Sequence, residues 1–90
     1  MTYREEFPDF DSSLPTIAGL TDQSWHNDAC PVLRNASGTV ELWCDYADAS
    51  AREFPDAPRF MLVLGNGAAI ESETLSEDFL AAVASAIERA

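Results

Sequence analysis

The stretch SWHNDACP, residues 24–31, holds the side chains of this protein that are best suited to chemistry. It contains the only histidine, His26, and one of the two cysteines, Cys30; the other cysteine is Cys44. Imidazole and thiolate are ligands that zinc prefers, and a thiolate beside an imidazole can act as a nucleophile. One hypothesis is therefore a metal-dependent or Cys/His enzyme centred on His26, Cys30 and Cys44, with Asp28 or Asp45 completing the set.

The spacing of these residues weakens that hypothesis. The chain has no Cys-x-x-Cys pair, no Gly-x-Ser-x-Gly stretch and no glycine loop that opens a helix. Asn27 and Asp28 are typical of turns, and Pro31 cannot donate a hydrogen bond to a sheet. We therefore expect SWHNDACP to be a structural corner that leads onto an edge strand, with both cysteines reduced and no metal or other cofactor.

Charge is the most unusual property of the sequence. Five arginines, no lysine and 16 acidic residues give a net charge of −11, and the acids are spread along the whole chain. Such a chain repels nucleic acid and membrane surfaces and attracts basic protein surfaces. The N-terminal stretch has neither the basic start nor the apolar run of a signal peptide, and nothing approaches the ~20 apolar residues of a membrane span. We expect a cytoplasmic protein that binds neither nucleic acid nor membranes directly.

The elements that would position these residues follow from length and periodicity. Ninety residues provide one domain around one core. The first part of the chain has no sustained periodicity, so we expect an irregular arm pinned to the core by apolar side chains, with room for a helical turn over residues 3–7. The predicted elements are the arm over 1–23, a first hairpin over 24–47, a linker crossing the surface over 48–58, a second hairpin over 59–73 and a helix over 74–90.

The first hairpin is predicted from the alternation in TVELWCDYA, residues 39–47. A two-residue Ser37-Gly38 loop pairs Arg34 with Glu41, whereas a three-residue loop would set Leu33 against Glu41. We predict the first register because it matches polarity across the strands. It places Cys30 beside Asp45 and the two thiols on opposite faces. The alternation puts Val40, Leu42, Cys44 and Tyr46 on one face and Glu41, Trp43 and Asp45 on the other.

The second hairpin is predicted from the turn sequence Gly65-Asn66-Gly67 between two apolar stretches. A two-residue loop would put Leu62 opposite Glu71. A three-residue loop with Gly67 in the left-handed region puts Leu62 opposite Ile70, and this is the register we predict. The core face then holds Phe60, Leu62, Leu64 and Ile70, and the other face holds Met61, Val63 and Glu71.

The C-terminal stretch predicts an amphipathic helix that lies on the sheet. Thr74 and Glu77 have the spacing of a capping box, and Arg89 lies in the last turn, where a cation is favoured. The predicted apolar stripe consists of Leu80, Val83, Ala84 and Ile87, with Phe79 beside it. The fold class is therefore α+β: a mainly antiparallel sheet of about four strands with the helix on one face.

The face of the sheet away from the helix is the more informative about function. Trp43, Met61 and Val63 project from it, so either the N-terminal arm covers them or they form an exposed aromatic and acidic surface. In the second case they suit a basic protein surface whose arginines stack on the rings and pair with the acids. The leading hypothesis is a small non-catalytic binding protein with the partner-binding residues Glu41, Trp43, Asp45, Tyr46, Asp48 and Glu71.

In size and charge the chain resembles small inhibitors carried by phages and mobile elements, anti-CRISPR proteins among them, although no motif carries that likeness. The resemblance implies an inhibitor that occupies the nucleic-acid-binding surface of a partner protein. The enzyme built on His26, Cys30 and Cys44 is one alternative. The other is a self-associating accessory module whose sheet edge pairs with a second copy, so both a monomer and a homodimer stay open.

Overall fold

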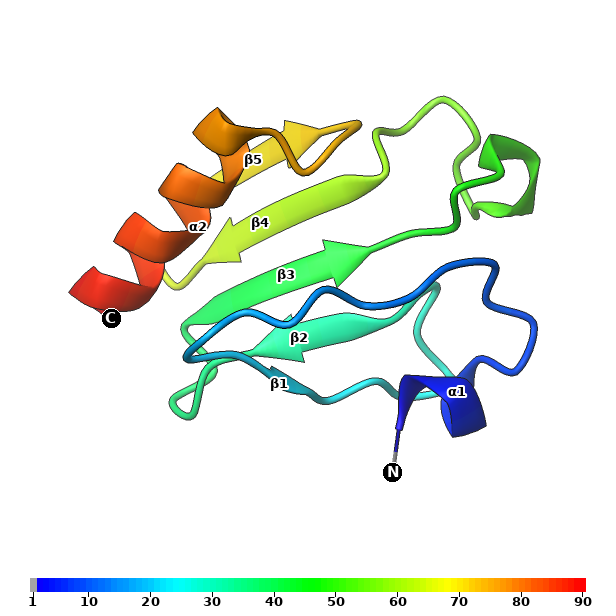
Figure 1. The fold of residues 1–90 in the computed structure, drawn as a ribbon, viewed down its shortest axis with the longest axis horizontal. Helices are drawn as coiled ribbons and strands as arrows, with labels where there is room; N and C mark the ends of the chain where they lie inside the picture. The colour runs from blue at the N-terminus through cyan, green and yellow to red at the C-terminus, as the bar shows by residue number, and fades with distance from the viewer. Residues whose placement is uncertain (1) are drawn as a thin grey trace.

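The computed structural model describes residues 2–90 and has an α+β fold (Figure 1). The sheet is antiparallel with five strands in chain order, and the predicted fold class is confirmed. The fifth strand arises because residues 21–22, at the end of the arm, pair with the first predicted hairpin. Residues 32–34, which follow SWHNDACP, therefore form an inner strand, and the prediction that this stretch leads onto an edge strand is wrong. The elements are α1 (Tyr3–Glu6), β1 (Thr21–Asp22), β2 (Val32–Arg34), β3 (Val40–Cys44), the 3-10 turn η1 (Ala49–Ala51), β4 (Phe60–Leu64), β5 (Ala69–Ser72) and α2 (Glu77–Arg89).

The register of the first hairpin is confirmed, with Arg34 opposite Glu41. The turn itself differs from the predicted Ser37-Gly38 loop. The Gly38 N–H donates to the Asn35 carbonyl, and the Asn35 side chain accepts from the Val40 N–H at 3.0 Å. The loop between Asn35 and Val40 therefore has four residues instead of the predicted two, and the pairing of Arg34 with Glu41 is unchanged.

The second hairpin has the predicted register and turn. Leu62 lies opposite Ile70, and Gly67 has a φ of 88°, in the left-handed region that glycine adopts at no steric cost. The Gly67 N–H donates to the Leu64 carbonyl, and the Leu64 N–H donates to the Ala68 carbonyl. The three-residue loop therefore places Met61 and Glu71 side by side on the face away from the helix.

The arm and α2 cover the same face of the sheet. The arm runs over β2 and β3, and α2 lies over the β4 and β5 side (Figure 1). Leu14 and Ile17 of the arm and Ile87 of α2 pack against one core cluster, so a single core joins both segments to the sheet. The buried members of that cluster are Leu20, Leu33, Val40, Leu42, Cys44, Phe60, Leu62, Phe79 and Val83.

Two details of the predicted helix are wrong. The N-cap is Ser76, whose hydroxyl accepts from the Phe79 N–H, so Thr74 lies outside the helix and forms no capping box with Glu77. In the predicted stripe, Leu80 is 38% exposed and Ala84 is exposed too, because the helix turns Phe79 and Val83 toward the sheet and leaves Leu80 at its margin. Phe79 packs near Phe60, with ring centroids 6.4 Å apart, and this aromatic contact favours the observed rotation.

The linker crosses the surface as predicted, but one buried side chain fixes its path. Arg52 is 6% exposed, and its guanidinium donates to the carbonyls of Tyr46, Ala47 and Ala57. It also forms a bidentate pair with the Glu73 carboxylate, with Nη2 2.9 Å from Oε2. Arg52 therefore holds both ends of the linker against the connection between β5 and α2.

Carboxylates hold the arm in the same way. Asp22 accepts from the backbone N–H of Tyr3 and of Ser24. Asp11 accepts from the N–H groups of Ala47 and Asp48, both at 2.9 Å. An irregular segment forms no regular ladder of backbone hydrogen bonds with its neighbours. Carboxylate side chains therefore accept the hydrogen bonds of the backbone N–H groups next to it. Part of the acidity of the chain is thus structural.

Candidate functional site

The second face of the sheet is left open, since the arm lies on the other side. Met61 is 37% exposed and Glu71 is exposed, while Trp43 is half-buried. Trp43 pairs with Met61 across β3 and β4, and Met61 pairs with Glu71 across β4 and β5. The alternative in which the arm covers this face is therefore wrong. We name it the open face, and its residues are Glu41, Trp43, Asp45, Met61 and Glu71.

A pocket of about 250 Å³ lies at the end of the open face that is nearer the linker. We name it the linker pocket; its apolar walls include Trp43, Met61 and Phe54. Phe54 is 67% exposed, which is unusual for a phenylalanine. Three carboxylates also line the pocket, those of Asp45, Glu53 and Glu71. One cation, Arg59, lines it as well, so the linker pocket combines exposed aromatic surface with an excess of negative charge.

Asp45 is the carboxylate in the least favourable surroundings. Burial raises its pKa above the ordinary value, although the hydrogen bond from the Tyr46 N–H and the charge of Arg52 act the other way. A half-buried carboxylate whose pKa is raised gains from a further cation placed beside it. Glu41, in contrast, already pairs with Arg34, and that guanidinium lies 5.4 Å from the centre of the Trp43 ring.

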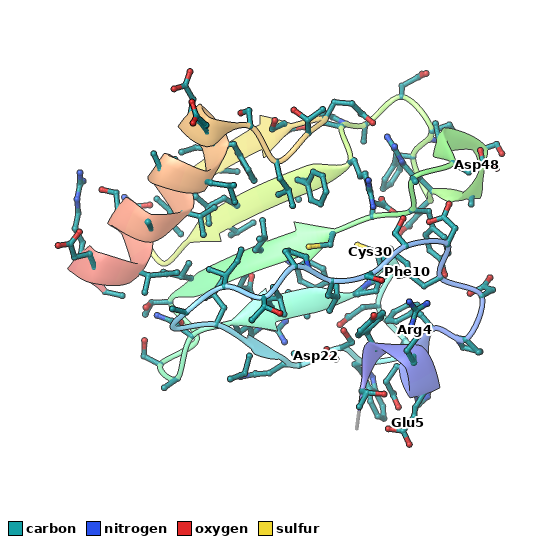
Figure 2. All side chains as sticks on the ribbon, viewed as in Figure 1. Arg4, Glu5, Phe10, Asp22, Cys30 and Asp48 are labelled. Carbon is teal, nitrogen blue, oxygen red and sulfur yellow. The ribbon has the colours of Figure 1, made fainter. Side chains whose placement is uncertain are left out.

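The other two predicted binding residues lie apart from the open face. Tyr46 is buried on the covered face, where its hydroxyl donates to Asp9 at 2.8 Å and its ring meets the edge of Phe10. Asp48 is the exposed first residue of the linker (Figure 2), and its side chain accepts from the Ser50 N–H at the start of η1. Tyr46 is an even number of residues away from the core residues Leu42 and Cys44, so the alternation of β3 places it on the same covered face.

The structure does not bring His26, Cys30 and Cys44 together. Cys44 belongs to the core, whereas Cys30 lines the linker pocket. Burial raises the pKa of both thiols to about 12, so both are protonated at neutral pH and are poor nucleophiles. His26 is exposed and its Nδ1 lies 2.9 Å from Glu6 Oε1. Within residues 2–90, no three His, Cys, Asp or Glu side chains are grouped as a metal site would require.

A scan against protein-family models gives no match for this chain, and searches of curated proteins and of solved structures give none either. Within the described residues, no helix has the length and apolar character needed to cross a membrane.

Sequence reasoning missed Glu53, Phe54 and Arg59, which contribute to the linker pocket. Phe54 could have been found from the sequence, because it is a large apolar residue in a polar linker. No pattern of alternating or helical spacing around it would place it in the core. Arg59 carried none. Its Nε donates to the Asp45 carbonyl at 3.2 Å, a contact that depends on how the linker returns to β4.

Proposed function

We propose that this protein is a small non-catalytic binding protein that docks its open face and linker pocket on a positively charged protein surface. One observation carries the proposal: the exposed side chains of Phe54 and Met61 lie beside the carboxylates of Asp45, Glu53 and Glu71 around a single pocket. Large apolar side chains that are exposed together and bordered by charge are typical of sites for protein partners.

The chemistry of the pocket fits an arginine or lysine side chain of the partner. The alkyl part of such a side chain packs on apolar walls, and a guanidinium stacks on an aromatic ring while it pairs with a carboxylate. Phe54 and Trp43 offer the rings, and Asp45 offers a carboxylate that burial leaves poorly compensated. A cation in the pocket would lower the pKa of Asp45 toward its ordinary value.

The distribution of acids supports the same proposal. Asp11 and Asp22 are engaged with backbone N–H groups of the protein itself. Glu53 and Glu71 make no side-chain hydrogen bond or ion pair within residues 2–90. Two of the acids around the linker pocket are therefore free to meet a partner's cations.

The proposed partner surface is one that otherwise holds nucleic acid, so that the protein acts as an inhibitor. Proteins that bind nucleic acid present arginine and lysine side chains to phosphates, and carboxylates can take the place of those phosphates. A net charge of −11 would steer association with such a surface. The inhibitory part of the proposal is supported by the net charge and by the resemblance in size and charge to small inhibitors carried by phages and mobile elements.

The test uses two variants with the same change in charge. In Glu53→Lys/Glu71→Lys the change lies at the linker pocket, and in Asp78→Lys/Glu88→Lys it lies at exposed positions of α2. We expect the tagged protein and the α2 variant to capture the same basic protein from a lysate of the source cells, and the pocket variant to lose it. Equal capture by both variants would contradict docking through the pocket.

A second step tests inhibition. The captured partner is mixed with its nucleic acid, and the parent protein is titrated in. Displacement of the nucleic acid by the parent and by the α2 variant, but not by the pocket variant, is the expected result. A ternary complex with nucleic acid still bound would leave the binding function in place and remove the inhibitory one.

A further inference from the structure

Strand β5 forms an edge of the sheet beside α2 (Figure 1). Ala69, Ile70 and Glu71 are all exposed, and Ile70 is 41% exposed although it is large and apolar. The strand contains neither proline nor lysine, the residues with which proteins often protect an edge. Such an edge can accept a further strand from another chain.

The backbone of β5 has free groups that point outward. The Leu64 N–H donates to the Ala68 carbonyl, and hydrogen-bonded pairs recur at every second residue of an antiparallel ladder. Ile70 and Ser72 therefore direct their backbone groups toward β4, with Ile70 paired to Leu62. The N–H and carbonyl groups of Ala69 and Glu71 point away from the sheet, where an added strand would bind them.

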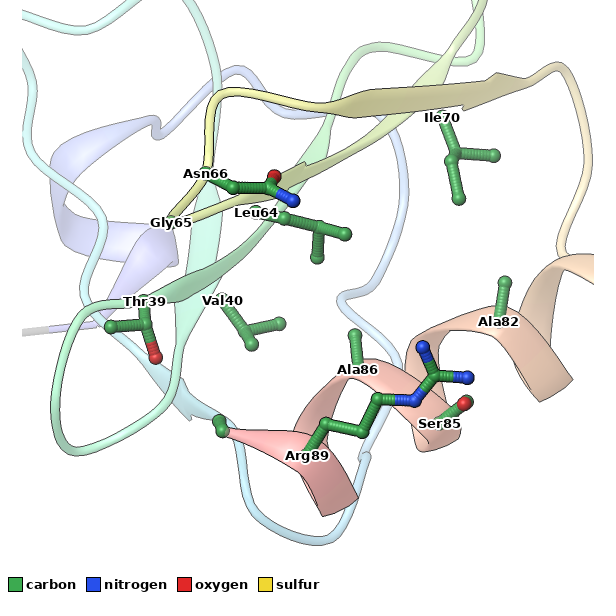
Figure 3. A pocket seen from close by; sticks show the side chains of 11 residues that line it. Thr39, Val40, Leu64, Gly65, Asn66, Ile70, Ala82, Ser85, Ala86 and Arg89 are labelled. Atoms are coloured by element: carbon green, nitrogen blue, oxygen red, sulfur yellow. The ribbon is translucent and has the colours of Figure 1, made fainter.

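On the covered face, an apolar groove under α2 crosses β3 and β4 and reaches this edge at Ile70 (Figure 3). It has a volume of about 430 Å³ and lies between α2 and the β4–β5 hairpin. Leu64 and Ile70 line it from the sheet, and the small side chains of Ala82 and Ala86 leave it open on the helix side. Arg89 lines the same groove and would repel a cation there. A side chain that enters this groove from an added strand should therefore be apolar.

On the open face, the same edge is acidic. Glu71 projects there beside Met61, and both line the linker pocket together with Asp45. A side chain of an added strand that points to this face should therefore be basic. Because successive side chains of a strand point to opposite faces, the two requirements together define a pattern of period two.

We infer that the β5 edge receives an extended segment of the basic partner as an added strand in which apolar and basic residues alternate. The inference rests on the proposed function, since the basic half of the pattern is the charge of the proposed partner. A second copy of this chain fits less well. Its own edge strand, Ala69–Ser72, has no cation to offer Glu71, and two chains with a net charge of −11 repel each other.

Two synthetic peptides of the same composition test the pattern. In one, valine and arginine alternate, and in the other the valines and arginines form separate blocks. Fluorescence anisotropy with labelled peptides measures binding to the full chain. We expect the alternating peptide to bind at least about tenfold more tightly, because only its apolar and basic residues reach opposite faces when its backbone pairs with β5.

Variants of one residue separate backbone pairing from charge. Glu71→Pro removes an outward N–H without removing a bond to β4, and Glu71→Gln removes only the charge. We expect Glu71→Gln to weaken the alternating peptide moderately and Glu71→Pro to abolish its advantage over the block peptide. Ala82→Leu, which fills the groove without altering the strand, should also reduce that advantage, and it serves if the proline variant fails to fold.

Equal binding of the two peptides to the parent protein would overturn the inference. If Glu53→Lys/Glu71→Lys abolishes capture of the partner while Glu71→Pro and Ala82→Leu leave it intact, the proposed function stands and the added strand is excluded. A dimer of the parent protein in light scattering that Glu71→Pro dissociates would also overturn the inference, because a second copy would then occupy the edge.

Discussion

The N-terminal arm and helix α2 cover the same face of one sheet by different means. The arm is irregular, and Asp11 and Asp22 hold it in place by accepting hydrogen bonds from backbone N–H groups. The helix satisfies its own backbone and binds through Phe79 and Val83, which are buried in the core. Acidity in this chain therefore has two roles: Asp11 and Asp22 hold the arm, whereas Glu53 and Glu71 of the linker pocket make no side-chain hydrogen bond or ion pair within residues 2–90.

The largest effect should come from the helix side. Phe79→Ala removes a ring that is 4% exposed, and we expect it to lower the free energy of unfolding by about 3–5 kcal/mol through lost burial and an unfilled cavity. Leu80→Ala is the matched control, with an expected loss below about 1 kcal/mol, since Leu80 lies at the margin of the helix. Urea unfolding measures both. Equal losses would mean that the helix packs through the predicted stripe instead.

The second effect concerns the linker, which resembles the arm in being held by hydrogen bonds. Arg52→Ala leaves three backbone carbonyls without the Arg52 donor and removes the ion pair with Glu73, and we expect the free energy of unfolding to fall by about 2–3 kcal/mol. Arg52→Lys keeps the charge but cannot reach all of these acceptors, so it should recover only part of the loss. An unchanged urea midpoint for Arg52→Ala would show that the linker is not anchored by this side chain.

A third variant tests the contact between the two covering segments. Gly19 has a φ of 90°, and a Cβ added there would lie 2.7 Å from Ile87 Cγ2. We expect Gly19→Ala to cost about 1–3 kcal/mol in stability, from backbone strain and from the clash with α2. Gly67→Ala is the control, since its φ is 88° and no atom lies within 4 Å of its added Cβ.

A double-mutant cycle separates the two causes. The cost of Gly19→Ala should fall in the Ile87→Ala background, where the clashing methyl group is absent, toward the cost of Gly67→Ala. An unchanged cost would mean that the arm and the helix are not in contact at this point.

The smallest effect should be the response of the arm to pH. Hydrogen bonds from the backbone N–H groups of Asp48 and Ala47 hold the pKa of Asp11 below its ordinary value. The stability that they contribute is present above the unfolded pKa of about 4 and is lost as the pH falls through the folded pKa. We expect the melting temperature to fall below about pH 4, and to fall less steeply for Asp11→Asn. The same slope for Asp78→Asn as for Asp11→Asn would assign the effect to net charge.

The sheet was predictable because its determinants are local. Polarity across the strands decided both registers, because Arg34 fits opposite Glu41 and Leu62 fits opposite Ile70 better than opposite Glu71. Strand β1 was not predictable, since two residues carry no period. Thr74 and Ser76 both have the chemistry of an N-cap, and only the packing of Phe79 on the sheet separates them. The residues of the open face could be predicted from the alternation along the strands. The linker pocket could not, because the path of the linker depends on Arg52, whose acceptors come from both sides of the linker.

The strand order has a consequence for how the chain folds. Each strand pairs with its neighbour in sequence, so the hairpins form from local contacts that close quickly. The arm is different, because Asp11 and Asp9 must find partners 36 and 37 residues further along the chain. During synthesis the arm leaves the ribosome before those partners exist. It can therefore dock only after residues 46–48 have been made, and its docking depends on contacts of longer range than those of the hairpins.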